Sequence, residues 1–211
     1  MMWLILLSAI SFCAAIGFRK PLSLARADYI APPLIVQRLT SGFSYQASDS
    51  FWLRAVQDFD FCSEKVNERE CKGKSWLFQM VNLTTELDKK FHEAYLYGGM
   101  ALTVIISDYA GASVIFDKGI ENFESDAGLN MVAAYHALYE EKNKAKASKL
   151  YLTAANSGAP PWMRVLAGKL AAESGEMEFA NLILQQMIAS SEDPKLVERL
   201  KEKLRDLKKS Q

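Results

Sequence analysis

The chain contains few of the residues on which enzymes and metal sites depend. Its 211 residues include only two histidines, His92 and His136, and three cysteines. The sequence has no glycine-rich phosphate loop, no HExxH motif, no Gly-x-Ser-x-Gly elbow and no second cysteine pair that could complete a zinc site. We therefore expect no metal, no cofactor and no enzymatic activity.

The chain also lacks an excess of either charge. Lys and Arg together number 25, as do Asp and Glu, so the sequence is not the polycation that nucleic-acid binding requires, and we expect no nucleic-acid partner. Half of the residues are hydrophobic, which is typical of a folded chain. No alternating run long enough for a sheet is present. The sparse glycines and prolines predict joints between helices, at Gly98-Gly99, Gly158–Pro161, Gly175 and Asp193-Pro194.

A triplet of residues at positions i, i+4 and i+7 recurs along the chain. Its first residue is small, its second is bulky, and its third is small or flexible. Its first residue steps from 112 to 147 and then to 180, which are intervals of 35 and 33 residues. A period in this range is typical of stacked helical hairpins, with the small residue where two helices approach and the bulky one filling the gap between them. The triplets are Ala112/Phe116/Gly119, Ala147/Tyr151/Ala154 and Ala180/Leu184/Met187.

The residues leading into these helices resemble the tetratricopeptide family over about residues 76–194. The three openings are Ser107–Ala112, Glu141–Ala147 and Ser174–Ala180, and Asp193-Pro194 matches the family's acidic-proline exit. Residues 76–87, ending at Asp88, are interpreted as a degenerate earlier repeat. The segments 39–43 and 49–57 further resemble the start of uncharacterised, membrane-anchored bacterial repeat proteins. The resemblance implies an all-α, tetratricopeptide-like helical-hairpin solenoid with an N-terminal membrane-anchor helix.

The first helix of each hairpin lines the concave side of such a solenoid. Side chains there that packing does not require are the best candidates for contacts with a protein or peptide partner. On this basis we predict partner-binding roles for Tyr95, Asn130, Tyr135 and Arg164.

The N-terminus carries an uncharged, apolar run over residues 3–18, followed by Arg19-Lys20-Pro21. This length suits either the apolar part of a signal peptide or a short membrane-spanning helix. We favour an uncleaved anchor in a bacterial inner membrane. The basic pair that follows favours a cytoplasmic location for the repeats.

Two cysteines argue for the opposite side of the membrane. Cys62 and Cys71 flank a polar segment, and a disulfide between them would close a short loop. Such a bond persists only in an oxidising compartment. The alternative is a pair of free thiols. We place the repeats in the periplasm and leave the disulfide as a hypothesis.

These observations divide the chain into an anchor or signal sequence (1–20), a linker (21–45), a helical repeat domain (46–194) and an amphipathic C-terminal capping helix (195–211). We expect a membrane-tethered scaffold or adaptor that binds a protein or peptide through its concave face. A structural subunit of a cell-envelope assembly is the first alternative, and it would expose Phe51 and Trp52. The second is an enzyme with a site in residues 46–92, which would unite His92 with carboxylates among Asp49, Asp58, Asp60 and Glu64.

Overall fold

A computed structural model describes residues 31–57 and 72–209, with side chains described as far as residue 206. The chain divides into two units, residues 1–30 and Ala31–Gln211, and all described helices belong to the second. All regular structure among the described residues is helical, with no strand, which confirms the all-α prediction. The apolar run 3–18, Cys62 and Cys71 lie outside the described residues.

The described helices follow one another closely. Their order is η2 (Leu34–Leu39), α2 (Ser44–Gln57), α3 (Trp76–Leu87), α4 (His92–Ala101), η3 (Leu102–Ile106), α5 (Tyr109–Asn122), α6 (Ala127–Tyr139), α7 (Lys144–Asn156), α8 (Trp162–Glu173), α9 (Met177–Ser190) and α10 (Pro194–Lys209). Helix η2 is a short 3₁₀ helix within the segment predicted as a linker, and η3 is a π-helical turn continuous with α4.

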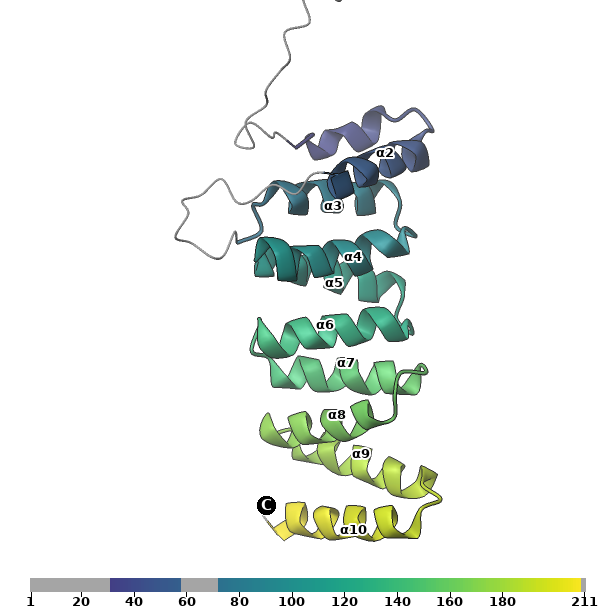
Figure 1. Cartoon of the computed structure of the whole chain (residues 1–211), viewed down its shortest axis with the longest axis vertical. Helices are drawn as coiled ribbons and strands as arrows, with labels where there is room; N and C mark the ends of the chain where they lie inside the picture. Colours follow the sequence, from purple (N-terminus) through teal and green to yellow (C-terminus); the bar gives the residue numbers. More distant parts are fainter. Residues whose placement is uncertain (1–30, 58–71, 210–211) are drawn as a thin grey trace, which may run out of the picture. The chain divides into compact units, whose positions relative to one another are not determined.

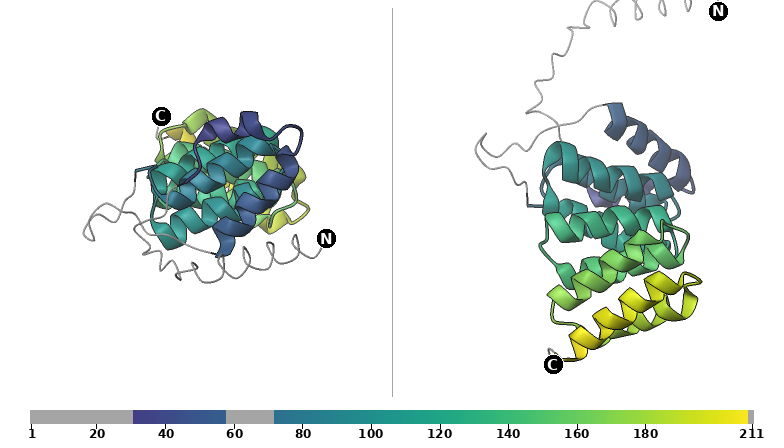
Figure 2. Two further views of the ribbon diagram at one scale, coloured as in Figure 1. Left: turned by 90° about the horizontal axis from the view of Figure 1, so that it is seen from above. Right: turned by 60° about the horizontal axis from the view of Figure 1, so that its bottom comes forward.

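Each helix packs mainly against the next one along the chain, in the manner of a helical solenoid (Figure 1). Helices α4 and α5, α6 and α7, and α8 and α9 form successive hairpins, and α4 also contacts α6. The last helix, α10, packs against α9 at the C-terminal end of this stack (Figure 2). Its Leu200 is buried in the hydrophobic cluster that runs from α6 to α10.

Polar residues before the helices explain where several of them begin. Ser75, Asp108, Asp126 and Asn143 each accept a hydrogen bond from a backbone N–H in the first turn of α3, α5, α6 and α7. Gly175 has a φ of 83° between α8 and α9, a left-handed conformation that favours glycine. The predicted joints at Gly158–Pro161, Gly175 and Asp193-Pro194 are confirmed.

The recurring triplets lie on the second helix of each hairpin, and all nine of their residues are buried. Ala112, Ala147 and Ala180 are each 0% exposed. The predicted contact face of α5, α7 and α9 is therefore confirmed. The earlier unit over residues 76–87 is also a helix, α3, which is followed by Asp88 as its C-cap residue, as expected.

The prediction of a helix joint at Gly98-Gly99 is wrong, because both glycines lie within α4 and are buried. A Cβ atom on Gly98 would lie 2.7 Å from Val81 Cγ1, and one on Gly99 would lie 2.5 Å from Phe116 Cε1. The two glycines let α4 approach α3 and α5 at once. They serve close packing rather than a turn.

Among the described residues, no helix is both long enough and apolar enough to cross a membrane. The predicted anchor, residues 1–20, lies outside the described residues.

Candidate partner-binding groove

An apolar groove of about 390 Å³ opens along the first helices of three successive hairpins. Most of its lining comes from α4 with η3, from α6 and from α8, and Phe116 of α5 and Tyr151 of α7 complete it. The wall side chains are almost all apolar or aromatic, and they include Met100, Val104, Met131, Tyr135, Trp162 and Met163. The volume lies within the range of pockets that hold ligands, about 300–1,000 Å³.

Several wall side chains are exposed although they are apolar. Val104 is 71% exposed, Trp162 57%, Tyr135 50% and Met100 39%. Single exposed apolar residues are ordinary, but a contiguous group around a concavity is typical of an interaction site. The groove is therefore the strongest candidate for a binding surface in the part of the chain that the structure describes.

The groove's position depends on the π-helical turn η3, which presents Val104 and Thr103 to it. The turn ends at Ser107, which has a φ of 60°, a left-handed conformation that is uncommon outside glycine. A π-helical turn within a helix is frequently found at functional sites. The sequence does not reveal this turn, because nothing in residues 102–106, Leu-Thr-Val-Ile-Ile, distinguishes a π-helical turn from an α-helix.

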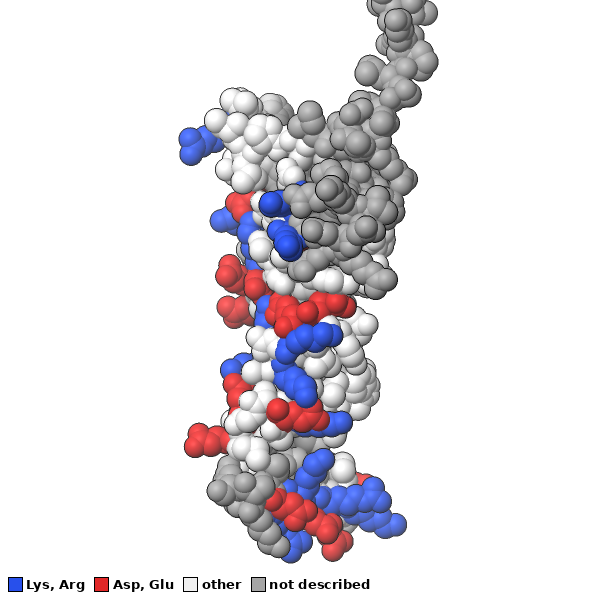
Figure 3. All heavy atoms as spheres, turned by 90° about the vertical axis from the view of Figure 1, so that its left-hand side faces the viewer, with Lys and Arg blue, Asp and Glu red and all other residues white. Residues whose placement is uncertain are grey.

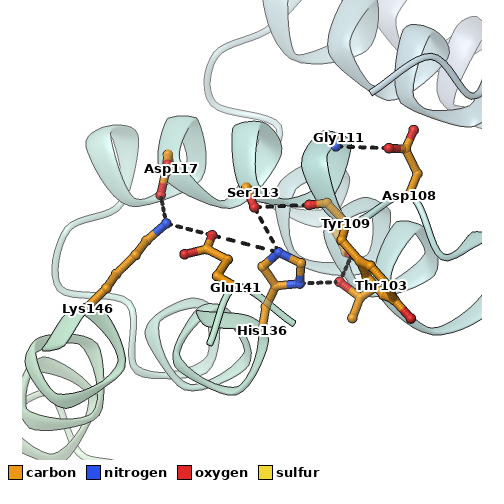
Figure 4. Close-up of polar contacts among 10 residues, drawn as sticks. Thr103, Asp108, Tyr109, Gly111, Ser113, Asp117, His136, Glu141 and Lys146 are labelled. Atoms are coloured by element: carbon orange, nitrogen blue, oxygen red, sulfur yellow. Dashed lines mark hydrogen bonds and ion pairs between the residues drawn. The ribbon is translucent and has the colours of Figure 1, made fainter. Parts of the chain in front are cut away.

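A buried histidine, His136, contacts residues of the groove lining, and Figure 4 shows it between Thr103 and Ser113. His136 is 1% exposed, and its Nδ1 lies 2.9 Å from the Thr103 hydroxyl while its Nε2 lies 3.0 Å from the Ser113 hydroxyl. Its ring also packs against Phe116, with centroids 5.4 Å apart. Since Thr103 and Phe116 both line the groove, His136 supports the groove from inside the core.

Charged residues extend this network towards α7. Lys146 Nζ lies 2.8 Å from Asp117 Oδ1 and 2.9 Å from Glu141 Oε1, and the latter is 3.8 Å from His136 Nε2. Burial lowers the pKa of His136 below its ordinary value of 6.5, and Lys146 acts in the same direction. Burial of Glu141 opposes ionisation, but hydrogen bonds from Lys146 and Ser113 bring its pKa below the ordinary value. The network thus favours a neutral histidine beside an ionised carboxylate.

The arrangement of Ser113 and His136 differs from that of a catalytic triad. In a triad the carboxylate binds the ring nitrogen opposite the one that faces serine. Here Glu141 and Ser113 both lie on the Nε2 side, whereas Nδ1 faces Thr103. The Ser113 oxygen also lies 3.0 Å from Tyr109 O, so one hydroxyl proton serves Tyr109 O, His136 Nε2 or Glu141 in turn. We interpret the network as a polar cross-link that holds η3, α5 and α6 together.

Two of the predicted binding residues have to be corrected, because Tyr95 and Asn130 are each only 1% exposed. The Tyr95 hydroxyl donates to Lys89 O at 3.3 Å, and burial with nearby acidic groups raises the pKa of Tyr95 to about 12. Asn130 Nδ2 donates to Glu124 O and Asp126 O, both at 2.8 Å. Both residues lie on first helices as expected, but on the packed side, where a partner cannot contact them.

The other two predicted residues differ from each other. Tyr135 lines the groove and packs against Tyr139, with ring centroids 4.6 Å apart. Arg164 lies on α8 but outside the groove's lining, where its Nη2 donates to Asn156 Oδ1 at 2.9 Å. The groove therefore brings together Tyr135 with residues that the sequence analysis had not selected, chiefly Val104, Met131 and Trp162.

The structure also places the residues of the two alternative functions. His92 Nε2 lies 3.2 Å from Asp126 Oδ2, and Asp49 is exposed on α2, whereas Asp58, Asp60 and Glu64 lie outside the described residues. Within the described ranges, no group of three or more acidic, histidine or cysteine side chains is placed to hold a metal.

Phe51 and Trp52, which a structural subunit would expose, are both half-buried. Trp52 packs edge-on against Phe91, with centroids 5.7 Å apart. The contact of Trp52 with Phe91 joins α2 to the residue that precedes α4.

Charge is mixed where the surface can be seen. Acidic and basic side chains alternate along the face in Figure 3, without a large area of one sign. Ion pairs such as Lys144 with Glu173 and Lys149 with Glu176 join neighbouring hairpins. Apolar side chains are also exposed on η2 and α2, among them Ile35, Leu39 and Leu53, and the groove differs from these in being an apolar concavity.

Comparisons with protein-family models, with curated proteins and with solved structures find no match to this chain.

Proposed function

We propose that this chain is a non-enzymatic, tetratricopeptide-like repeat module that binds an apolar segment of a protein partner through the groove of α4/η3, α6 and α8. The observation that carries the proposal is the groove itself, a concavity bordered by exposed apolar side chains from three hairpins. Covering these side chains with an apolar partner releases water from both surfaces, which favours association.

The tetratricopeptide-like interpretation is supported by two independent features. The triplets at intervals of 35 and 33 residues are buried on second helices, and the hairpins follow one another in chain order. The groove lies on first helices, as the concave binding surface of such an array would.

The proposal includes a membrane tether through residues 3–18 in a bacterial inner membrane, with the repeats on the periplasmic side. The support is the uncharged N-terminal run and the pair Cys62 and Cys71, whose disulfide would need an oxidising compartment. A tether would keep the groove near the envelope, so the partner would be an envelope protein.

Site-specific photo-crosslinking in living cells tests the binding claim. A photoreactive amino acid replaces Val104 in the groove or, as a matched control, Val114, an exposed valine on α5. We expect a discrete crosslinked protein from position 104 and none from position 114. Equal crosslinking from both positions, or none from position 104, would contradict the proposal.

A further inference from the structure

The chemistry of the groove restricts the conformation of what it can bind. Its lining side chains, all within the described residues, include no acidic or basic group. A charged segment would lose its hydration there without gaining an ion pair, and this cost would exclude it. The occupant must therefore present an uncharged, apolar surface.

The groove has few hydrogen-bonding groups to offer, because the polar side-chain groups of its lining are the hydroxyls of Thr103, Tyr135 and Tyr151 and the indole N–H of Trp162. The Thr103 hydroxyl already lies 3.0 Å from Gly99 O and 2.9 Å from His136 Nδ1. Tyr151, at the base of the groove, is only 5% exposed. An extended peptide carries a free N–H and C=O at every residue, and each needs a partner when it is buried. A helix satisfies these groups internally and presents only side chains.

Asn130 and Arg164, the two non-aromatic polar residues predicted to bind a partner, lie outside the groove lining. Asn130 uses its Nδ2 on Glu124 O and Asp126 O, and Arg164 binds Asn156 on the neighbouring helix. By contrast, methionines from three helices, Met100, Met131 and Met163, line the groove. Methionine side chains adapt to varied apolar shapes, which suits the irregular surface of a docked helix.

We infer that the partner segment binds as an amphipathic helix, with uncharged apolar anchors at positions i, i+3, i+4 and i+7 inserted between η3, α6 and α8. This inference rests on the proposed function and specifies its ligand. The helix-in-groove mode explains a surface that is rich in apolar contacts and poor in hydrogen-bond partners.

Two synthetic peptide libraries of equal composition test the inference. Both contain peptides of about 14 residues, or about four helical turns. In one library, randomised apolar residues stand at positions i, i+3, i+4 and i+7. In the other library, they stand at every second position. The remaining positions of both libraries carry equal numbers of Lys and Glu. The full-length protein is held in lipid nanodiscs, so that no detergent competes for the groove. Val104→Glu protein in the same nanodiscs serves as the control for binding to lipid or to other surfaces.

We expect the helical library to be enriched on the wild-type protein over the Val104→Glu protein. The enriched peptides should gain helical circular dichroism on binding. A central proline should weaken them about 100-fold, because proline strongly disfavours a helix interior. Enrichment of the alternating library alone, or a proline without effect, would overturn the helical mode and leave the proposed function standing. Enrichment of neither library would count against both.

Discussion

Replacing Asp108 should destabilise the fold far more than its role as a helix cap alone would suggest. Its carboxylate is 0% exposed and accepts hydrogen bonds from two parts of the chain. Oδ1 accepts from Gly73 N at 2.6 Å and Gly111 N at 3.0 Å, and Oδ2 accepts from the Ser75 hydroxyl at 2.6 Å and Ser75 N at 3.1 Å. One side chain thus caps α5 and fixes the residues that begin α3.

The magnitude follows from the donors that Asp108→Ala would leave without an acceptor. The N–H groups of Ser75 and Gly111 are buried, and each orphaned buried donor costs about 1–3 kcal/mol. The Ser75 hydroxyl can rotate, and Gly73 N, which is only partly buried, contributes less. We expect a loss of about 3–5 kcal/mol from the free energy of unfolding. Asp108→Asn keeps one acceptor oxygen and should lose roughly half as much.

Asp126 provides the matched control, because it caps the next hairpin in the same way. Its Oδ1 accepts from Leu129 N at 2.6 Å, and its carboxylate is 35% exposed beside His92. Asp126→Ala should therefore cost only about 1 kcal/mol, the usual value of a helix cap. Chemical denaturation followed by circular dichroism of the full-length variants measures both. Equal losses for the two alanine variants would refute the reasoning.

Three further predictions concern packing, pH and compartment. Ala147→Trp should overpack the 0%-exposed site on α7 and lower the free energy of unfolding by about 1–3 kcal/mol or more; an unchanged melting temperature would argue against the repeat register. Because burial lowers the pKa of His136, the unfolded chain takes up a proton that the folded chain does not, so stability should fall as pH drops below about 6.5. Denaturation midpoints between pH 7.5 and 5 should show this fall in the wild type and a smaller one in His136→Gln. If the repeats face the periplasm, a membrane-impermeant maleimide should label Cys62 and Cys71 in intact cells only after reduction; labelling only after permeabilisation, without reductant, would place them in the cytoplasm.

The sequence was sufficient to predict the helical architecture, because its signal is periodic. The repeated triplets identify which face of α5, α7 and α9 is buried, and three of the four predicted joints coincide with helix ends. The Gly98-Gly99 pair was misleading because glycine serves both turns and close helix contacts. Only the proximity of Val81 and Phe116 in the structure separates the two uses.

The binding surface was harder to predict. Periodicity places Tyr95 and Asn130 on the first helices of their hairpins. It does not show which side of such a helix faces the groove and which side packs against neighbouring helices. The contacts of Asp108 with Gly73 and Ser75 join residues more than 30 positions apart, and no local pattern reveals them. The groove itself depends on how η3, α6 and α8 meet in space.

The affinity of a partner segment for groove variants decides whether the groove is the binding site. The segment crosslinked at position 104 is synthesised, and its binding to full-length wild-type, Val104→Glu and Val114→Glu proteins is measured by titration calorimetry. The account predicts that Val104→Glu weakens binding at least about ten-fold, since it replaces an apolar contact with a charge that must be desolvated. Val114→Glu, at an exposed position outside the groove, should leave the affinity within about two-fold of the wild type. Equal affinities for the wild-type and Val104→Glu proteins would contradict the claim that the groove is the binding site.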